Sequence, residues 1–600
     1  MESRTIPSVF REQVAKLRSR PMVYSRRDRH WRPLTWLQIE ERVNTAAAGL
    51  LARGIESGDR VAIIGESSVE WVIADLAILS IGAVTVAISE TASDDDIQWI
   101  LDDADVSAVF IGDRELLKLI TGHSNDHERA CVFIAFHSAV QLLDELDEAH
   151  LSLLGLENIG RESPELDRVA QCTAAIAPTD LMTLIYTSGT TGKPKGVMIS
   201  HENMVSNCLA CIRAIPISHE DVLLSFLPLS HSFERMAGYY MPALFGGATI
   251  YYSSGLERLM EDISEVRPTL MTGVPKLYEK IFRRAQGVRR ASKPTQRLAM
   301  DAALSVGARL SRKHQKGKNI SPLLRWQYGW LRDRIFSELH ERLGGRLRLL
   351  VSGGAALAPA ISEFFFSAGI LILEGYGLTE TSPVVSVNRP ESYQFGSVGR
   401  ALDNVRVRTA PDGELMIKAP SVMMGYWRQQ QETLRVLSDD GWLATGDLGK
   451  IDRDGFIWIK ERKKDLFKDS GGRYIAPQRV EKLLRLDPYV EQVCLVGDER
   501  PYCVALIVPD VSALEAWAKK KKLFVRDPDE LVQNEKIRGL MKDAVDRVNS
   551  RLARHETIRD FALIADPFTT REDLLTPSLK VKRAHVMAKY SELVESLYEN

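Results

Sequence analysis

The sequence contains few cysteines and no excess of charge of one sign. Only 6 of its 600 residues are cysteine, and 78 Lys and Arg nearly balance 80 Asp and Glu, giving a formal net charge of -2. So few cysteines do not make a disulfide framework, which indicates a reducing compartment. A charge this close to zero generates no global field that would attract a polyanion, so we expect no nucleic-acid partner.

The sequence also lacks a long hydrophobic run. The longest apolar stretch without a charge is LAILSIGAVTVAIS at 76–89, whereas a membrane-spanning helix needs about 20 residues. The N-terminal segment has no apolar core of the kind that marks a secretory signal. We therefore expect a cytoplasmic protein that at most lies peripherally on the inner membrane surface.

The length of the chain and its hydrophobic pattern predict several domains. A chain of 600 residues is too long for one hydrophobic core. Apolar strands alternate with amphipathic helices at about 34–110 and again at about 181–377, which is typical of parallel β/α layers. Short strands with Asp-Gly turns follow, and they predict a small antiparallel barrel or distorted sheet.

The predicted fold class is therefore α/β. We expect a large N-terminal domain at 1–461, made of two β/α layered subdomains and a small β-barrel at about 384–460, hinged to a mobile α+β domain at 462–600. A basic helical insertion is expected at about 283–340, because 283–318 contain eleven Lys and Arg but one acid. Either a solvated helical face or a patch that contacts anionic lipid heads explains this composition.

The stretch YTSGTTGKPKG at 186–196 is dense in glycine, hydroxyls and lysine, and it follows the apolar run LMTLI. Glycine lets backbone N–H groups turn toward a phosphate, and hydroxyls and a cation complete such a site. It is not the P-loop of kinases and GTPases, because Pro194 follows Lys193 where that motif has Ser or Thr. A plain surface loop is the alternative. The candidate phosphate-binding residues are Thr187, Ser188, Gly189, Thr190, Thr191, Gly192 and Lys195.

Glycine turns also end the two apolar runs LRLLVSGG and ILILEGYG. Ligands of parallel α/β sheets bind at the carboxyl ends of the strands. We therefore expect these two turns to meet the 186–196 stretch at one site.

The stretch YTSGTTGKPKG resembles the signature of the acyl-adenylate-forming superfamily, which includes acyl- and aryl-CoA synthetases. Further stretches match in the expected order, and LPLSHSFERMAGYY at 227–240 resembles the long-chain fatty acyl-CoA synthetases. The resemblance implies that ATP and Mg²⁺ convert a long-chain fatty acid into an acyl-adenylate and pyrophosphate, and that coenzyme A then takes the acyl group. The matching stretches are LPLSH (227–231), SGGAAL (352–357), EGYGLTET (374–381), TGD (445–447), ERKKD…GGRYIAP (461–477) and TPSLKVKR (576–583).

The resemblance also implies roles for residues of the C-terminal domain. The superfamily's catalytic lysine falls on Lys580, although Leu579 stands where relatives usually have glycine, and Lys582 is a close neighbour. Lys464 occupies the hinge position two residues after Arg462. The side that would receive coenzyme A after the domain swings contains Gly471, Gly472 and Arg473.

For the nucleotide, Glu380 and Thr187 are the implied ligands of Mg²⁺, and Asp447 and Arg462 are the implied contacts of the ribose. Tyr376 would stack on the adenine, because the glycines on both sides of it let a flat base lie close. The other implied nucleotide contacts are Gly353, Gly354, Ala355, Gly375, Gly377 and Thr379, of which Thr379 is, like Glu380, also a candidate catalytic residue.

For the fatty-acid substrate, His231 is a candidate catalytic residue that would gate the channel through which the acid enters. The alternative is a histidine packed in the core. Four residues would wall an acyl tunnel, although ordinary core packing explains them almost as well: Phe233, Met236, Gly238 and Tyr239.

The acceptor and the exact acid stay open at this point. No carrier domain follows Lys580 in the sequence, so the thiol is expected from solution, and coenzyme A is preferred. Alternatives are a fatty acyl-AMP ligase that passes the acyl group to an acyl carrier protein, or a synthetase for another hydrophobic acid. A phosphotransferase would release ADP, and a non-catalytic lipid-binding protein would not need Glu380, Asp447, Arg462 and Lys580.

Overall fold

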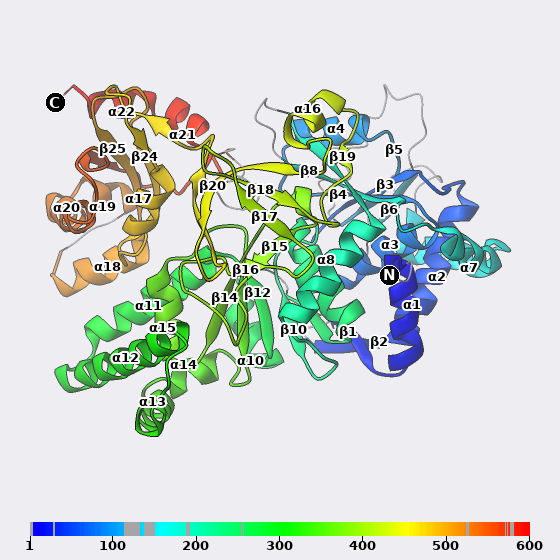
Figure 1. The fold of residues 1–600 in the computed structure, drawn as a ribbon, viewed down its shortest axis with the longest axis horizontal. Coiled ribbons are helices and arrows are strands. Elements are labelled where there is room, and N and C mark those ends of the chain that lie inside the picture. Colours follow the sequence, from blue (N-terminus) through cyan, green and yellow to red (C-terminus); the bar gives the residue numbers. More distant parts are fainter. Residues whose placement is uncertain are drawn as a thin grey trace.

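The computed structural model describes residues 4–27, 30–112, 132–136, 151–187, 193–253, 255, 257–523, 527–569, 572, 574–575 and 581–599. It confirms the predicted α/β class, because two layered subdomains lie side by side and the C-terminal part forms a smaller separate lobe (Figure 1). The N-terminus lies on the far side of the molecule from the C-terminus (Figure 1).

The first layered subdomain is built on a sheet whose central strands are parallel, as predicted. In the described part of the chain this sheet has eight strands, and its edge pairs β8–β9 and β9–β19 are antiparallel. The strands, in sheet order, are β19 (Gly425–Tyr426), β9 (Lys195–Ser200), β8 (Leu181–Thr187), β4 (Val84–Ile88), β3 (Arg60–Ile64), β5 (Val106–Ile111), β6 (Val132–Ala135) and β7 (Leu151–Ser152).

The second layered subdomain is built on a mixed sheet of nine strands among the residues described, again with a parallel centre. The strands, in sheet order, are β16 (Arg400–Ala401), β15 (Val384–Val387), β14 (Leu371–Gly377), β13 (Leu349–Ser352), β12 (Leu270–Gly273), β10 (Val222–Ser225), β11 (Thr249–Tyr252), β1 (Pro21–Arg27) and β2 (His30–Thr35). β15 and β16 fall inside the range expected for the barrel, but they pair with β14 and extend this sheet.

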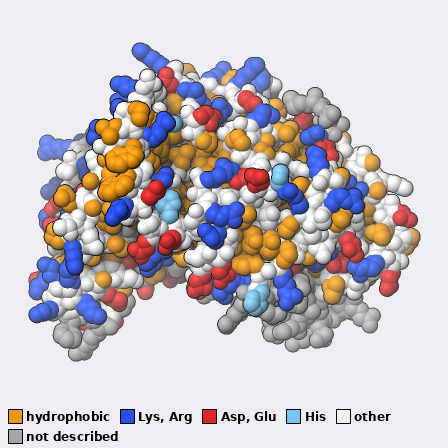
Figure 2. Space-filling model, turned by 90° about the horizontal axis from the view of Figure 1, so that it is seen from below, with side chains coloured by type: hydrophobic (Ala, Val, Ile, Leu, Met, Phe, Trp, Pro, Cys, Tyr) orange, Lys and Arg blue, Asp and Glu red, His pale blue; other side chains and the backbone are white. Residues whose placement is uncertain are grey.

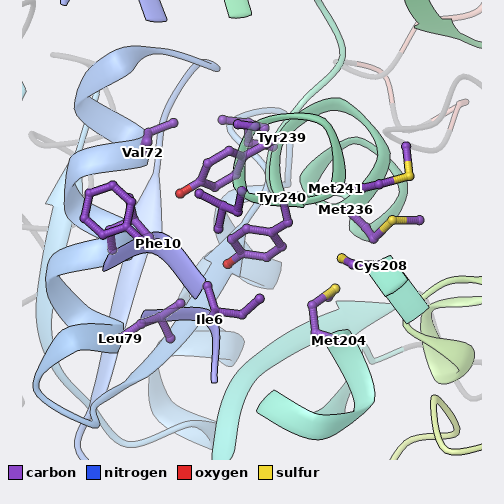
Figure 3. Close-up of a cluster of buried hydrophobic side chains, with 14 of the residues drawn as sticks. Ile6, Phe10, Val72, Leu79, Met204, Cys208, Met236, Tyr239, Tyr240 and Met241 are labelled. Atoms are coloured by element: carbon purple, nitrogen blue, oxygen red, sulfur yellow. The ribbon is translucent and has the colours of Figure 1, made fainter. Parts of the chain in front are cut away.

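The largest cluster of buried side chains takes residues from both sheets and from helices that pack on one another, including α1, α3, α8 and η3. Figure 3 shows how side chains of these four helices converge. Local sequence explains where several of them begin, since Ser68 and Ser200 each accept a hydrogen bond from a backbone N–H of the first turn of the helix that follows. The helices are α1 (Ile6–Leu17), α2 (Trp36–Ala52), α3 (Val69–Ser80), α6 (Leu153–Glu162), α7 (Glu165–Ala175), α8 (His201–Ala214), α9 (Ser232–Glu234) and the π-helix η3 (Arg235–Phe245).

A second cluster of buried side chains lies under the helices at the lower left of Figure 1. Four of these helices, α11 to α14, overlap the sequence of the predicted basic insertion. The helices are α10 (Leu259–Val266), α11 (Pro275–Ala291), α12 (Pro294–Gln315), α13 (Pro322–Ile335), α14 (Ser337–Arg342) and α15 (Pro359–Ser367), and α4 (Asp94–Asp103) packs on the eight-stranded sheet.

Where a β-barrel was expected, four antiparallel strands form a small sheet of order β17-β18-β20-β21. The predicted boundary at 461/462 falls at the end of β21, and it stays a prediction. The elements of this region are β17 (Arg406–Thr409), β18 (Glu414–Lys418), α16 (Gln430–Val436), β20 (Leu443–Ile451) and β21 (Ile457–Arg462), preceded by the short 3₁₀-helix η4 (Thr379–Thr381).

The C-terminal lobe has its own buried cluster and rests on the second subdomain. Arg283 of α11 is buried and donates to the backbone oxygen of Val490, and Lys482 donates to the backbone oxygen of Leu357. Its elements are β22 (Phe467–Lys468), β23 (Tyr474–Ile475), α17 (Pro477–Leu484), β24 (Val490–Val496), β25 (Cys503–Pro509), α18 (Val511–Lys520), α19 (Pro528–Gln533), α20 (Glu535–Asn549), β26 (Ile558–Leu563), α21 (Arg583–Lys589) and α22 (Ser591–Ser596).

A buried ion pair joins η3 to the first subdomain. Asp75 of α3 and Arg235 of η3 are both 0% exposed and form a salt bridge. The other carboxylate oxygen of Asp75 accepts from the hydroxyl of Tyr240 at 2.6 Å, and Arg235 donates to the hydroxyl of Thr183 at 2.8 Å. Burial is the largest single effect on the pKa of Arg235 and would lower it, but Asp75, Tyr240 and Tyr239 together raise this pKa above its usual value. Every charge in this cluster therefore has a partner, which is the condition for burying it.

Removing one partner of this pair leaves a buried charge uncompensated. We expect Asp75→Asn to lower the free energy of unfolding by about 3–5 kcal/mol, because Arg235 stays buried. Urea denaturation followed by circular dichroism measures the change. Asp403→Asn is the matched control, because Asp403 pairs with Arg213 where both side chains are half exposed, and such pairs contribute about 0–1 kcal/mol. Equal shifts in the two variants would contradict the prediction.

Candidate active site

One cavity of about 760 Å³ lies where the two layered subdomains and the small sheet meet, and this volume is typical of small-molecule sites. As expected, it is lined by the end of β8 and by the glycine turns after β13 and β14. The residues that were candidates from the sequence and line it are Thr187, Lys195, His231, Phe233, Met236, Gly353, Gly354, Gly375, Tyr376, Gly377, Thr379, Glu380, Arg462 and Lys464.

Asp447 holds two of these side chains in place. Its carboxylate is 4% exposed, one oxygen accepts from the hydroxyl of Tyr376 at 2.6 Å, and the other accepts from Nε of Arg462 at 2.9 Å. Burial and the neighbouring carboxylate raise the pKa of Tyr376 well above its usual value, so the phenol stays protonated and donates. A carboxylate has about four lone-pair sites, so Asp447 keeps unused acceptor capacity, but Asp447 itself is not among the residues that line the cavity.

The acid Glu380 lies on η4 at the edge of the same cavity. One of its carboxylate oxygens accepts from the hydroxyl of Tyr426 at 2.9 Å. Thr187 lines the cavity at the end of β8. Within the described residues no group of three or more His, Cys, Asp and Glu is placed to hold a metal ion. Glu380 and Thr187 nevertheless offer oxygen atoms to one cavity, which is the donor type that Mg²⁺ prefers alongside water and phosphate.

Two of the lysines that line the cavity are paired with acids. Lys195 forms a salt bridge with Glu432 of α16, and its ammonium lies 5.6 Å from the ring centroid of Tyr426. Lys463 donates to Asp412 at 2.6 Å. The charges of these two lysines are therefore already balanced by the chain itself.

Two glycines of the turns are required by close contacts. A Cβ on Gly377 would lie 1.8 Å from the backbone oxygen of Pro383, so the turn after β14 could not close around a larger residue. A Cβ on Gly353 would lie 2.7 Å from the ring of Phe233, which therefore packs directly against backbone. These contacts bring the turns to the wall of the cavity.

The other end of the cavity is apolar and is formed by η3, α8 and strand β12. Phe233 and Met236 line it, as expected from the sequence. Gly238 and Tyr239 do not, because their side of η3 faces the core: a Cβ on Gly238 would lie 2.3 Å from the carboxylate of Glu234, and Tyr239 is 0% exposed. Figure 3 shows the ring of Tyr239 on the side of α3, away from Met236. The residues that complete the apolar wall are Cys211, Ile215, Ile217, Ala237, Met241 and Leu270.

Other candidates lie off the cavity or outside the described residues. Ala355 is exposed in the turn after β13 and does not line the cavity. The turn between β22 and β23 is held by Asp469, which accepts from the backbone N–H groups of Gly471 and Arg473 at 3.1 and 2.8 Å, and this turn does not line the cavity either. The candidates that fall outside the described residues are Ser188, Gly189, Thr190, Thr191, Gly192 and Lys580.

Sequence reasoning missed several residues of the site. Tyr426 of β19 and Glu432 of α16 were not recognised, because both follow a run of short strands and neither belongs to a glycine-rich signal. The apolar wall could have been found from the helical spacing of Phe233, Met236, Ala237 and Met241. His231 lines the cavity, and its Nδ1 accepts from the backbone N–H of Phe233 at 3.2 Å.

A buried acid, Glu234, lies directly behind the apolar wall. It is 0% exposed and accepts from the hydroxyls of Ser225 and Thr272 at 2.6 and 2.7 Å. Burial raises its pKa to about 7, although the two hydrogen bonds partly offset the effect of burial. The folded protein therefore holds this proton more tightly than the unfolded chain, in which the pKa is near 4.5.

This shift makes stability depend on pH. As the pH rises from about 4.5 to 7, the unfolded chain releases the proton of Glu234 and the folded protein keeps it, so the contribution of this group to stability falls. The loss is about 1.4 kcal/mol for each pH unit between the two pKa values and stops above the higher one.

We therefore expect Glu234→Gln to gain stability relative to the wild type as the pH is raised across this window. Urea unfolding midpoints at both ends of the window measure the difference. Glu257→Gln, at an exposed position, is the control and should follow the wild type. A constant difference between Glu234→Gln and the wild type at all pH values would be evidence against the raised pKa.

Comparison with known proteins agrees with this geometry. Residues 10–427 match the model of the AMP-binding enzyme family, and residues 465–600 match that of the AMP-binding enzyme C-terminal domain. The chain is 33% identical to the long-chain-fatty-acid–CoA ligase FadD15 of Mycobacterium tuberculosis, over 95% of this chain and 92% of that protein. It is 29% identical to the human long-chain-fatty-acid–CoA ligase 1, over 99% of this chain and 86% of that protein.

Among solved structures, the adenylation domain of a carboxylate reductase from Mycobacterium chelonae is similar. It superimposes with a TM-score of 0.78 at 25% identity, over 100% of this chain and 92% of that chain. The resemblance inferred from the motifs is thus confirmed along nearly the whole sequence. The protein belongs to the AMP-binding enzyme family.

Proposed function

We propose that the protein activates a long-chain fatty acid with ATP and then transfers the acyl group to coenzyme A. The observation that supports this most directly is the composition of the single cavity described above. Its polar end contains Thr187, Glu380 and Arg462, and its other end is walled by apolar side chains of η3 and α8. Membership of the AMP-binding family and the names of the curated relatives support the same reaction.

The nucleotide would lie along the polar end. Tyr376 would stack on the adenine between the glycine turns, and Asp447 and Arg462 would accept and donate hydrogen bonds at the ribose. The geometry favours these roles, because the hydrogen bonds of Asp447 fix Tyr376 and Arg462 beside each other before a ligand binds. Residues 188–192 and Lys195 would contact the phosphates.

In the first step, a carboxylate oxygen of the acid bonds to the α-phosphorus of ATP as the bond to pyrophosphate breaks. Both reactants are anions, so positive charge that is already in place lowers the barrier. Lys580, which lies outside the described residues, would bridge the acid and the α-phosphate as a point charge. Mg²⁺ held by Glu380 and Thr187 would neutralise charge on the phosphates.

In the second step, the thiol of coenzyme A attacks the acyl carbonyl, AMP leaves, and a thioester forms. The C-terminal lobe would turn about Lys464, which lines the cavity at the start of the lobe, and hinge residues of this kind absorb large backbone changes. The turn with Gly471, Gly472 and Arg473 would then face the cavity. A separate acyl carrier protein is the second candidate for the acceptor.

The apolar end of the cavity supports a hydrophobic acid. Each methylene group buried there contributes about 0.8 kcal/mol, so the length of the wall determines which chains bind well. Cys211 and Ile215 of α8 lie on this wall. A synthetase for another hydrophobic carboxylic acid remains the alternative for the substrate class.

The protein would meet its acid at a membrane surface. No helix in the described parts of the chain is both long and apolar enough to span a bilayer. The basic segment 283–318 supports peripheral contact instead, because it carries cations on α11 and α12.

Replacing the proposed catalytic lysine should separate the two steps. We expect Lys580→Ala to slow adenylation by at least roughly a hundredfold, because a charge aligned on the transition state is lost, while thioester formation from supplied acyl-adenylate survives. Pyrophosphate exchange and acyl-CoA formation measure the two steps. Lys582→Ala is the matched control and should keep both. If Lys580→Ala loses both steps equally, the assigned role is wrong.

Filling the apolar wall should shorten the acids that the protein accepts. We expect Cys211→Phe to lower kcat/KM for long acids by about fourfold for each methylene excluded, at about 0.8 kcal/mol each, and to leave short acids unaffected. Release of AMP and pyrophosphate against acids of graded length, with and without coenzyme A, measures this. Unchanged rates with short acids serve as the folding control. Formation of ADP would refute the proposed reaction. Rates that do not depend on chain length would refute the proposed apolar wall.

A further inference from the structure

Helix α13 has two apolar faces, and the protein itself covers one of them. Leu324 is buried, and the hydroxyl of Tyr328 donates to the backbone oxygen of Phe366 at 2.7 Å. Leu331 packs against the second cluster of buried side chains, which lies in the second subdomain. These residues are spaced four and three apart, so they share the face of α13 that packs on the second subdomain.

The other apolar face of α13 is exposed to solvent. Leu323, Trp326 and Trp330 are 63%, 65% and 52% exposed, and their spacing of three and four places them on one side of the helix. No other tryptophan in the described part of the chain is as exposed. Figure 2 shows orange side chains gathered on the left of the face seen from below, where α13 lies lowest in Figure 1.

Cations surround these apolar side chains. Residues 283–335 contain 14 Lys and Arg, and the acids are Asp301 and Asp333. The guanidinium of Arg334 lies 5.6 Å from the ring centroid of Trp330, so charge and aromatic surface are adjacent on α13 itself. Other exposed cations of α12, α13 and the turn between them are Arg297, Arg309, Arg312, Lys316, Lys318 and Arg325.

We infer that this α13 surface, made of Leu323, Trp326, Trp330, Arg325 and Arg334, docks on an anionic phospholipid bilayer. An amphipathic helix with Trp and Leu on one face and Arg beside them lies in the plane of the interface, with the apolar face among the headgroups. Tryptophan prefers this depth because its ring is apolar and its N–H is polar. Each Lys or Arg held near the surface adds about 1 kcal/mol of attraction to anionic lipid.

The charge of the surface favours a bilayer over a protein partner. The segment 283–335, which includes α13, carries 14 Lys and Arg against 2 acids, and an excess of positive charge of this size favours an anionic bilayer. The charge pattern of the sequence indicated membrane contact through residues 283–318. The exposed apolar face lies instead on α13 at 322–335, which follows that segment.

Docking of α13 on a bilayer does not depend on the proposed function. Only its purpose, which is to bring the protein to a fatty-acid substrate, rests on that function. Fatty acids partition into bilayers, so docking through α13 would hold the cavity close to the substrate's source. Vesicle binding is measured without any substrate, so its failure and the failure of the proposed reaction are distinguishable.

The test is co-sedimentation of the full chain with vesicles of phosphatidylcholine alone, or of equal parts phosphatidylcholine and phosphatidylglycerol. We expect the wild type to bind the mixed vesicles, to bind phosphatidylcholine weakly, and to be released by added salt. The double variant Trp326→Ala with Trp330→Ala should bind mixed vesicles at least about tenfold more weakly. Its release of AMP with a short, water-soluble acid should equal that of the wild type.

Matched single variants separate the surface from general hydrophobicity. Leu323→Ala should weaken binding, and Leu154→Ala, at a 61% exposed position on α6, should not. Should the double variant not fold, Leu323→Glu replaces it, since a charge on this face opposes insertion. The inference would be overturned if the α13 variants bound vesicles as well as the wild type did, or if the wild type bound both kinds of vesicle equally. It would also be overturned if the variants changed only self-association on gel filtration.

Discussion

The candidate site depends on the hydrogen bonds of one buried carboxylate, Asp447. Tyr376 comes from the nine-stranded sheet and Arg462 from the last strand of the small sheet, and Asp447 accepts from both. Because the carboxylate is buried, these bonds are charge-assisted and little screened by water. They fix the small sheet against the glycine turns, and they fix the strand from which the C-terminal lobe departs. The cavity has its shape because these elements meet at this carboxylate.

The sequence was sufficient to predict the layered class and much of the polar end of the cavity. Parallel strands end at a common edge, so the turns after residues 187, 352 and 377 could be expected to meet. Thr187 at the end of β8 and the turns after 352 and 377 line one cavity. Gly353 and Gly377 were recognisable as glycines of turns that end apolar runs, and the structure shows close contacts that leave no room for a side chain there. The ends of apolar strands and the turns that follow them could therefore be predicted from residue type and spacing, whereas the roles of Glu380 and Asp447 were implied by the family resemblance.

Features that depend on how distant segments pack did not follow from the sequence. Tyr426 and Glu432 reach the cavity only because β19 pairs with β9 and positions α16. Tyr239 was placed on the acyl wall because it lies close in sequence to Met236, but η3 turns it into the core, where the pair Asp75–Arg235 fixes the helix. β15 and β16 joined the large sheet through pairing with β14, which a pattern of short strands cannot reveal.

The salt bridge between Lys195 and Glu432 has a consequence for how a polyanion enters. Glu432 satisfies Lys195 in the chain described here, and it also pairs with Arg435 on its own helix. A phosphate that takes Lys195 must displace this carboxylate, so the two compete for one ammonium group. If a nucleotide phosphate contacts Lys195 as proposed, nucleotide affinity is the difference between the attraction of Lys195 to the phosphate and its attraction to Glu432.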